Sequence, residues 1–238
     1  MTDFLFSGCT IQSRLPFIEA AFKFIAEKIN VEVRDIPGAT CCMEPVGLRS
    51  ISNSAWLSVN ERMRTSASGK SIITLCEGCN LSLSESGEII NSDSKVSGTL
   101  QFLFKNLEKI EQFVQFRNEK KMAMFPGCHC EYVCSKEGSS AMDMMESVLS
   151  VIGAEPMQVK KDLCCGGGVT GIDQELDSRI LNEAIDSFKA TGAECVVTSC
   201  PFCFLRFDMI GKFKTYHIAE LVAIAMGFED TTKYHLSK

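Results

Sequence analysis

Cysteine spacing is the feature that most constrains the fold of this chain. Ten of its thirteen cysteines fall into two copies of one pattern, a lone cysteine, then an adjacent pair, then a Cys-x-x-Cys motif. The copies comprise Cys9, Cys41, Cys42, Cys76 and Cys79, and then Cys128, Cys164, Cys165, Cys200 and Cys203. The lone cysteine precedes the pair by 32 and 36 residues, and the pair precedes the motif by 34 and 35. A repeat that preserves thiol positions indicates two metal or redox centres built by duplication.

The composition favours a globular protein with a substantial core. The chain has 238 residues, 45% of them hydrophobic, which is enough for one large or two small domains. Its formal net charge is -6, and its lysines and arginines are scattered along the sequence. Because no basic patch is present to bind a phosphate backbone, the sequence argues against nucleic acid as a partner.

The ends of the chain argue against export and membrane insertion. The first residues include the acidic Asp3 and no basic segment, unlike a secretory signal. The longest apolar stretch, 217–228, is interrupted by Glu220 and falls short of the roughly 20 residues of a membrane-spanning helix. We therefore expect a cytoplasmic protein with no membrane span. In a reducing cytosol, so many cysteines more often bind metal or perform thiol chemistry than form disulfides.

Strands and helices are predicted to alternate in the same order in both halves. Short β-prone segments lie at 3–8, 31–36 and 71–75, and again at 121–125, 155–159 and 194–199. Helices are predicted between them at 16–29, 56–63, 145–152 and 176–188. This order predicts an α/β protein with two pseudo-symmetric βαβ-type halves, each a small parallel sheet flanked by helices. The cysteines follow the carboxyl ends of the strands, where open parallel sheets bind their ligands.

We expect three segments along the chain. The first repeat covers 1–97 and the second repeat covers 121–238. Between them, 98–120 is predicted as a connecting amphipathic helix, because its apolar residues have helical spacing among lysines and glutamates. The polar, serine-rich segment 91–98 is the best candidate for a linker.

Five thiols in each set limit what the sets can bind. Structural zinc takes four ligands, and a single Cys-x-x-Cys motif would favour it. Thiol exchange is a second possibility, because the CPFC sequence at 200–203 follows a predicted strand and opens a helix, as in thioredoxin-type sites. Adjacent side chains diverge, so the Cys-Cys pairs suit a multi-iron cluster with several attachment points. We favour iron-sulfur centres over zinc and over metal-free redox chemistry.

The segments around these cysteines also carry a resemblance to a known family. They are GCTIQSRLPFIEAA (8–21), CCMEP (41–45), CEGC (76–79), GCH (127–129), CCGGG (164–168), TSCPFCFLRFD (198–208) and HIAELVAIAMG (217–227). They span nearly the whole chain and resemble the CCG-domain family, most closely the B subunit of heterodisulfide reductases. The resemblance implies two noncubane 4Fe-4S clusters, one in each five-cysteine set, with all ten cysteines as ligands.

The resemblance further implies that this chain is a catalytic subunit, which reduces the mixed disulfide of coenzyme M and coenzyme B in methanogenesis. The disulfide would be split between the two clusters. This chain has no P-loop, so it is expected to bind no flavin or nucleotide and to receive its electrons from other subunits. The resemblance implies that the iron-sulfur C subunit passes the electrons to this chain and that the flavin-bearing A subunit supplies the C subunit. The residues expected at the reacting centre are Cys41, Cys42, Cys164, Cys165 and His129.

Two other functions remain open at this point. CCG domains also occur as electron-relay subunits of thiol:fumarate reductases and of complexes resembling succinate dehydrogenase. A heterodisulfide-reductase-like subunit of sulfur oxidation, acting on another disulfide or a persulfide, is the other alternative. Complete cysteine sets in both halves weigh against the relay, because a relay protein could lose one set.

The remaining cysteines have no counterpart in the first repeat. We interpret Cys130, Cys134 and Cys195 as small buried or incidental thiols. Arg14 follows Cys9 closely and is either an anchor for an anionic substrate or an ordinary solvated arginine.

Histidines and glycines near the cysteines have two interpretations each. His129 follows a predicted ligand and is either a hydrogen-bond or proton donor or a structural histidine, whereas His217 and His235 are interpreted as structural. The glycine run 166–168 is expected to let the backbone approach a cluster closely, with a simple tight turn as the alternative.

Overall fold

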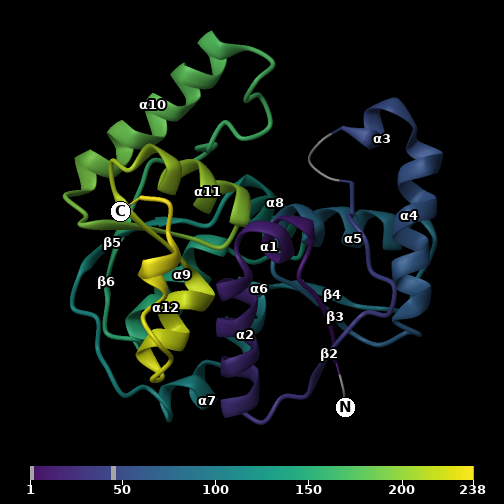
Figure 1. Cartoon of the computed structure of the whole chain (residues 1–238), viewed down its shortest axis with the longest axis horizontal. Coiled ribbons are helices and arrows are strands. Elements are labelled where there is room, and N and C mark those ends of the chain that lie inside the picture. Colours follow the sequence, from purple (N-terminus) through teal and green to yellow (C-terminus); the bar gives the residue numbers. More distant parts are fainter. Residues whose placement is uncertain (1–2, 44–46, 238) are drawn as a thin grey trace.

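Two four-stranded parallel sheets form the framework of the molecule (Figure 1). The computed structural model describes residues 3–43 and 47–237. The first sheet has the order β2-β1-β3-β4 and the second has the equivalent order β6-β5-β7-β8. Every neighbouring pair is parallel. The strands are β1 (Asp3–Phe6), β2 (Val33–Asp35), β3 (Ile72–Thr74), β4 (Val96–Gly98), β5 (Lys121–Phe125), β6 (Glu155–Gln158), β7 (Cys195–Thr198) and β8 (Lys214–His217).

Helices flank both sheets, which confirms the predicted α/β class with two similar halves. In the first half they are α1 (Cys9–Arg14), α2 (Pro16–Lys28), α3 (Leu48–Ile51), α4 (Asn53–Ser66), α5 (Glu77–Ile89), α6 (Thr99–Lys105) and α7 (Leu107–Glu111). In the second half they are α8 (Cys128–Lys136), α9 (Ala141–Val151), α10 (Gln174–Thr191), α11 (Pro201–Ile210), α12 (Ile218–Ala225) and the 3-10 helix η1 (Thr231–Tyr234).

Local sequence explains how α2 and α4 form. Pro16 occupies the first turn of α2, where its missing N–H is no loss, and Ile18, Phe22 and Ile25 on one face are fully buried. Ser52 caps α4, because its Oγ accepts a hydrogen bond from the Ala55 N–H at 3.3 Å. Both helices were predicted, the first of them from its apolar spacing, and both predictions are confirmed.

The segment between the halves differs from the prediction. Residues 96–98 of the expected linker form the edge strand β4, which pairs with β3. The expected single connecting helix is two short helices, α6 and α7, because Asn106 leaves the helical conformation and its Nδ2 donates to the Phe102 carbonyl at 2.9 Å. The strand β8 has a matching place in the second sheet and was also missed.

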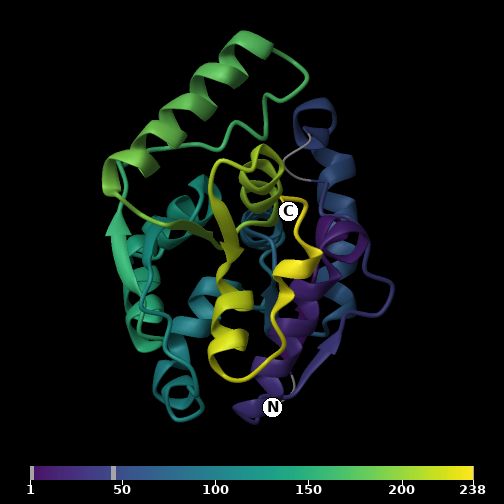
Figure 2. The same ribbon diagram turned by 60° about the vertical axis from the view of Figure 1, so that its left-hand side comes forward.

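Each half contributes a helix that covers the other half. Helix α12 packs against α2, and α6 packs against α9, while α5 packs against α8. Figures 1 and 2 show α2 and α12 side by side. Aromatic rings cross the same boundary, with centroids 5.9 Å apart between Phe17 and Phe204 and 5.0 Å apart between Phe24 and Phe228. The two halves therefore share one hydrophobic core, which contains buried residues from both.

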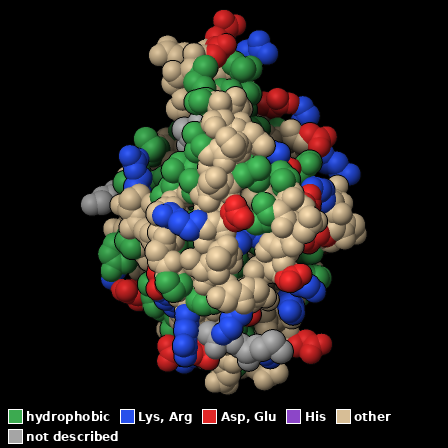
Figure 3. Space-filling view, turned by 90° about the vertical axis from the view of Figure 1, so that its right-hand side faces the viewer, with side chains coloured by type: hydrophobic (Ala, Val, Ile, Leu, Met, Phe, Trp, Pro, Cys, Tyr) green, Lys and Arg blue, Asp and Glu red, His purple; other side chains and the backbone are tan. Residues whose placement is uncertain are grey.

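The surface seen in Figure 3 carries mixed charge. Lysine and arginine side chains lie interspersed with aspartate and glutamate over this face, with hydrophobic side chains between them. Among the helices that the structure describes, none has the length and apolar character needed to cross a bilayer.

A buried histidine joins β8 to the end of β7. His217 is fully buried, its Nε2 lies 3.0 Å from the Ser199 carbonyl oxygen, and its Nδ1 accepts a hydrogen bond from the Ala219 N–H at 3.3 Å. These contacts suit the neutral tautomer with the proton on Nε2. Burial lowers the pKa of His217 to about 4, although the bond to Ser199 opposes this shift.

His217 is expected to make the stability of the fold depend on pH. Between its ordinary pKa of about 6.5 and its folded pKa of about 4, the unfolded chain binds a proton that the folded chain does not. The free energy of unfolding should therefore fall by up to about 3 kcal/mol as the pH drops through this window. His217→Gln keeps an amide donor for Ser199 but cannot titrate, so urea unfolding of the variant should lack this slope. The same pH dependence in both proteins would contradict the assignment.

Candidate metal centres

The ten patterned cysteines follow the carboxyl ends of β1, β2 and β3 in the first sheet and of β5, β6 and β7 in the second. Cys9 begins α1 after β1, and Cys76 stands between β3 and α5. Cys128 and Cys200 hold the equivalent places after β5 and β7. The two Cys-Cys pairs follow β2 and β6 in loops. Glu44 and Pro45, which complete the CCMEP segment, lie outside the described residues.

The first set forms a continuous chain of contacts. The Cys9 Sγ donates to the Cys41 Sγ at 3.4 Å, and the Cys42 Sγ donates to the Cys79 Sγ at 3.1 Å. Hydrogen bonds also join Cys41 to Cys42 and Cys76 to Cys79. The order of contacts in the first set is therefore Cys9, Cys41, Cys42, Cys79 and Cys76.

The second set repeats this order. Cys128 is hydrogen-bonded to Cys164, Cys164 to Cys165, Cys165 to Cys203, and Cys203 to Cys200. Equivalent cysteines therefore have equivalent neighbours in the two halves.

The two sets meet at Cys76 and Cys200, whose thiols lie close enough for each to shift the pKa of the other. These two residues are counterparts in the repeat, so the meeting point lies on the approximate twofold axis between the halves. All ten thiols thus form one line, which runs outward from Cys76 and Cys200 to Cys9 at one end and Cys128 at the other. The sequence places each set at a sheet edge but does not predict that the sets adjoin.

Exposure changes along this line. Its ends, Cys9 and Cys128, are exposed, and their neighbours Cys41 and Cys164 are half-buried. The six inner cysteines, from Cys42 through to Cys165, are buried. The outer ends of the line are therefore its solvent-accessible part. All thirteen cysteines are free thiols.

Hydrogen bonds between thiols favour a thiolate in each set. Bonds from Cys200 and then from Cys79 lower the pKa of Cys76 to about 6. In the second set, bonds from Cys128 and then from Cys165 lower the pKa of Cys164 to about 2. The bond with Cys164 in turn raises the pKa of Cys165 to about 12. Thiolate is the form that binds metal, so each set offers at least one ready ligand.

Two matched glycines let the backbone approach the thiols. Gly8 and Gly127 have φ angles of +80° and +94°, a conformation that residues with side chains rarely adopt. A Cβ atom at Gly8 would lie 3.0 Å from the Cys79 Sγ, and one at Gly127 would lie 3.3 Å from the Cys203 Sγ. Both glycines therefore leave room beside a Cys-x-x-Cys motif at the same position of each repeat.

The second Cys-Cys pair has additional backbone donors. The N–H groups of Gly166 and Gly167 donate to the Sγ atoms of Cys164 and Cys165, both at 3.4 Å. In the first pair, the Met43 N–H donates to the Cys41 Sγ at 3.3 Å. Backbone N–H bonds stabilise thiolate charge, which suits bound metal.

Soft thiol donors at this density suit zinc or iron-sulfur clusters. Within 3–43 and 47–237, no group of three or more Cys, His, Asp or Glu side chains is arranged to hold a single metal ion. The donor set itself, five thiols that include a thiolate and a glycine-lined approach, fits a cluster with several attachment points.

Glu77 is a site residue that the sequence reasoning missed, although it lies within the CEGC segment. It is buried beside Cys76, and its Oε2 accepts a hydrogen bond from the Asn80 Nδ2 at 3.1 Å. Burial raises the pKa of Glu77 to about 7, while the bond with Asn80 opposes the shift. Cys200 lies close enough to add to the rise, which places this carboxyl where the two sets meet.

His129 lies near both sets. Its Nδ1 is 3.4 Å from the place where a Cβ atom on Gly78 would stand, inside the first Cys-x-x-Cys motif. Its charge also helps to lower the pKa of Cys164, after the larger effects of the thiol hydrogen bonds and the Gly166 N–H. The candidate role of His129 at the reacting centre is compatible with this place.

The other three cysteines are buried in the shared core, and Cys195 lies on β7. Cys130 lies within reach of Glu77 and Ser199, beside the place where the two sets meet. Arg14 is exposed at the far end of α1 from Cys9, where it lines a cavity of about 510 Å³ together with Phe17 and Tyr234.

Comparisons with known proteins agree with this arrangement. The family model CCG, described as a cysteine-rich domain, matches residues 4–84 and 122–208. The B subunit of the ferredoxin/F420H2-dependent CoB-CoM heterodisulfide reductase of Methanosarcina acetivorans is 29% identical, over 94% of this chain and 89% of that protein. The 8-methylmenaquinol:fumarate reductase membrane anchor subunit of Wolinella succinogenes is 25% identical, over 93% of this chain and 91% of that protein.

Solved structures show a similar fold. A hypothetical protein from Helicobacter pylori matches with a TM-score of 0.71 and 13% identity, over all of this chain and 52% of that chain. At this identity the likeness concerns the fold alone. The family model, in contrast, matches most of the chain and spans both cysteine sets. This chain therefore belongs to the CCG cysteine-rich domain family.

Proposed function

We propose that the chain is the catalytic subunit of a heterodisulfide reductase-type complex, which reduces the mixed disulfide of coenzyme M and coenzyme B to two thiols. The observation that carries this proposal is the single line of ten thiols, in which two equivalent sets adjoin at Cys76 and Cys200. Reduction of a disulfide takes up two electrons and two protons and releases two thiols. Two adjoining redox sites match this stoichiometry.

We propose that each set holds one noncubane 4Fe-4S cluster, an extension of the iron-sulfur binding that family membership implies. When bound, the clusters would supply single electrons and iron atoms that bind sulfur. The ligands would be the five thiolates of each set. The N–H groups of Gly166 and Gly167 would stabilise the charge on Cys164 and Cys165, and Gly8 and Gly127 would leave room beside Cys79 and Cys203.

Substrate would approach the accessible part of the line. Cys9 and Cys128 are exposed, and Cys41 and Cys164 are half-buried, so these positions mark the side that a small disulfide can reach. His129 would hold a proton on its imidazole for a departing thiolate, because it lies beside the first Cys-x-x-Cys motif and near Cys164.

Partner subunits would deliver the electrons. The relative from Methanosarcina acetivorans is the B subunit of a reductase that uses ferredoxin or F420H2. By analogy, this chain would receive electrons in the cytoplasm from the iron-sulfur C subunit, which would itself receive them from the flavin-bearing A subunit.

A second candidate is an electron-relay subunit of a fumarate reductase-type complex. The 25% identity to the Wolinella succinogenes protein favours it, because that protein is a membrane anchor subunit. In this case the same thiols would hold clusters, but no disulfide would be reduced. A sulfur-oxidation subunit that acts on another disulfide or a persulfide would retain the same residues.

Metal analysis tests what the sets bind. After anaerobic purification, the chain is expected to contain about eight irons together with acid-labile sulfide, and little zinc, because each set would hold four irons. Elemental analysis and a sulfide assay measure these contents. One or two zinc ions without sulfide would contradict the iron-sulfur proposal.

Replacement of one inner ligand tests the catalytic role. Cys165→Ser is expected to abolish reduction of the mixed disulfide by reduced viologen and to remove about half of the iron. Cys195→Ser is the matched control, because Cys195 is also buried but belongs to neither set, and it should keep both properties. Full activity of Cys165→Ser would contradict the catalytic role. Iron in the unaltered protein without disulfide reduction would favour the electron relay.

A further inference from the structure

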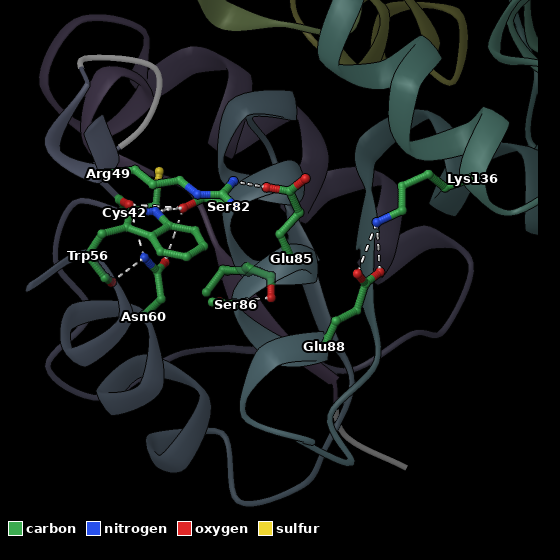
Figure 4. Close-up of polar contacts among 10 residues, drawn as sticks. Cys42, Arg49, Trp56, Asn60, Ser82, Glu85, Ser86, Glu88 and Lys136 are labelled. Atoms are coloured by element: carbon green, nitrogen blue, oxygen red, sulfur yellow. Dashed lines mark hydrogen bonds and ion pairs between the residues drawn. The ribbon is translucent and has the colours of Figure 1, made fainter. Parts of the chain in front are cut away.

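Buried polar side chains hold the backbone of Cys42 in place (Figure 4). The Ser82 Oγ donates to the Cys42 carbonyl oxygen at 3.0 Å, and the Asn60 Nδ2 donates to the same oxygen at 3.2 Å. Ser82 and Asn60 are at most 1% exposed. The two donors come from different helices, α5 and α4, so they fix the carbonyl from two directions.

Both donors are themselves held by the only tryptophan of the chain. The Trp56 Nε1–H donates to the Ser82 Oγ at 2.7 Å, and the Asn60 Nδ2 also donates to the Trp56 carbonyl at 2.9 Å. Because the hydroxyl of Ser82 accepts from Trp56, its own proton can point at the Cys42 carbonyl oxygen at 3.0 Å, which is nearer than its other acceptor, the Asn60 Oδ1 at 3.4 Å. In buried surroundings such a fully bonded network resists rearrangement, since any broken bond leaves a polar group unpaired.

An ion pair covers the outer side of this network. The Arg49 guanidinium lies 4.6 Å from the centre of the Trp56 ring and pairs with Glu85 of α5 (Figure 4). The Arg49 side chain thereby covers the ring of Trp56, whose indole N–H bonds to Ser82 of α5.

The second half holds its cysteine pair in another way. In the part of the chain that the structure describes, no side chain donates to the Cys165 carbonyl. Instead, the N–H groups of Gly166 and Gly167 bond to the sulfur atoms of Cys164 and Cys165. The side-chain brace is therefore particular to the first set.

We propose that Ser82 and Asn60 are positioning residues, which hold Cys42 so that its thiol meets Cys79 in the first set. The consequence for metal binding depends on the proposed function, whereas the positioning of Cys42 does not. Cys42 and Cys79 come from a loop and a helix, and their Sγ atoms are 3.1 Å apart. Without the brace, the loop would carry the Cys42 thiol away from its neighbours, and the first set would lose one ligand while the second set stayed intact.

Ser82→Ala and Ser86→Ala form a matched pair that tests this proposal. Both serines are buried on α5, one helical turn apart, but the Ser86 Oγ donates to the Leu83 carbonyl of its own helix at 3.1 Å and does not contact Cys42. In anaerobically purified protein, Ser82→Ala should lose about half of the iron and the electron paramagnetic resonance signal of one centre. Ser86→Ala should keep the iron and both signals. Full iron and unchanged signals in Ser82→Ala, or the same loss in both variants, would overturn the proposal.

Alkylation of the metal-free protein separates this proposal from the proposed function. Iodoacetamide labelling, followed by peptide mass spectrometry, should modify the buried Cys42 roughly tenfold faster in Ser82→Ala than in the unaltered chain, while Cys165 reacts at an unchanged rate. If the unaltered protein holds no labile sulfide, the iron-sulfur proposal fails. The rate at which iodoacetamide labels Cys42 still decides the role of Ser82. Equal labelling of Cys42 in the two proteins would overturn the positioning role.

Discussion

The contact between Cys76 and Cys200 is the constraint on which the rest of the site depends. Cys76 lies two residues after the end of β3, and Cys200 lies two residues after the end of β7. Because β3 and β7 are inner strands, this contact brings the carboxyl edges of the two sheets together. This is possible because the halves exchange covering helices, with α12 against α2 and α6 against α9. The shared core and the single line of thiols are thus two results of one approximate twofold arrangement.

The two sets are alike in their cysteines but differ in their surroundings. The residue after Cys76 is the buried Glu77, whereas the residue after Cys200 is Pro201, so only one side of the meeting point carries a carboxyl. Side chains on α4 and α5 donate to the Cys42 carbonyl of the first pair. Backbone N–H groups donate to sulfur in both pairs, from Met43 in the first and from Gly166 and Gly167 in the second. Hydrogen bonds to sulfur and nearby charge tune iron-sulfur centres, so we expect these differences to give the two proposed clusters different reduction potentials.

Much of the fold follows from local sequence signals, and the parts that do not have physical reasons. Apolar runs before Cys76 and Cys200 identify β3 and β7, and the apolar stripe of α2 is legible because it is fully buried. The strand β4 is only three residues long, lies at a sheet edge and follows a serine-rich segment, so it resembles a linker. The contact of Cys76 with Cys200 and the brace on Cys42 join distant segments, and no local pattern encodes them. The two five-cysteine sets are legible in the sequence, but their meeting is not.

Locating the iron in crystals tests the central claim most directly. Crystals of anaerobically purified protein, measured on both sides of the iron absorption edge, would give an anomalous map of the metal. The account predicts two groups of iron density, one bounded by Cys9, Cys41, Cys42, Cys76 and Cys79 and the other by their five counterparts, which approach each other near Cys76 and Cys200. Density in only one set, or anomalous signal at the zinc edge instead, would contradict it.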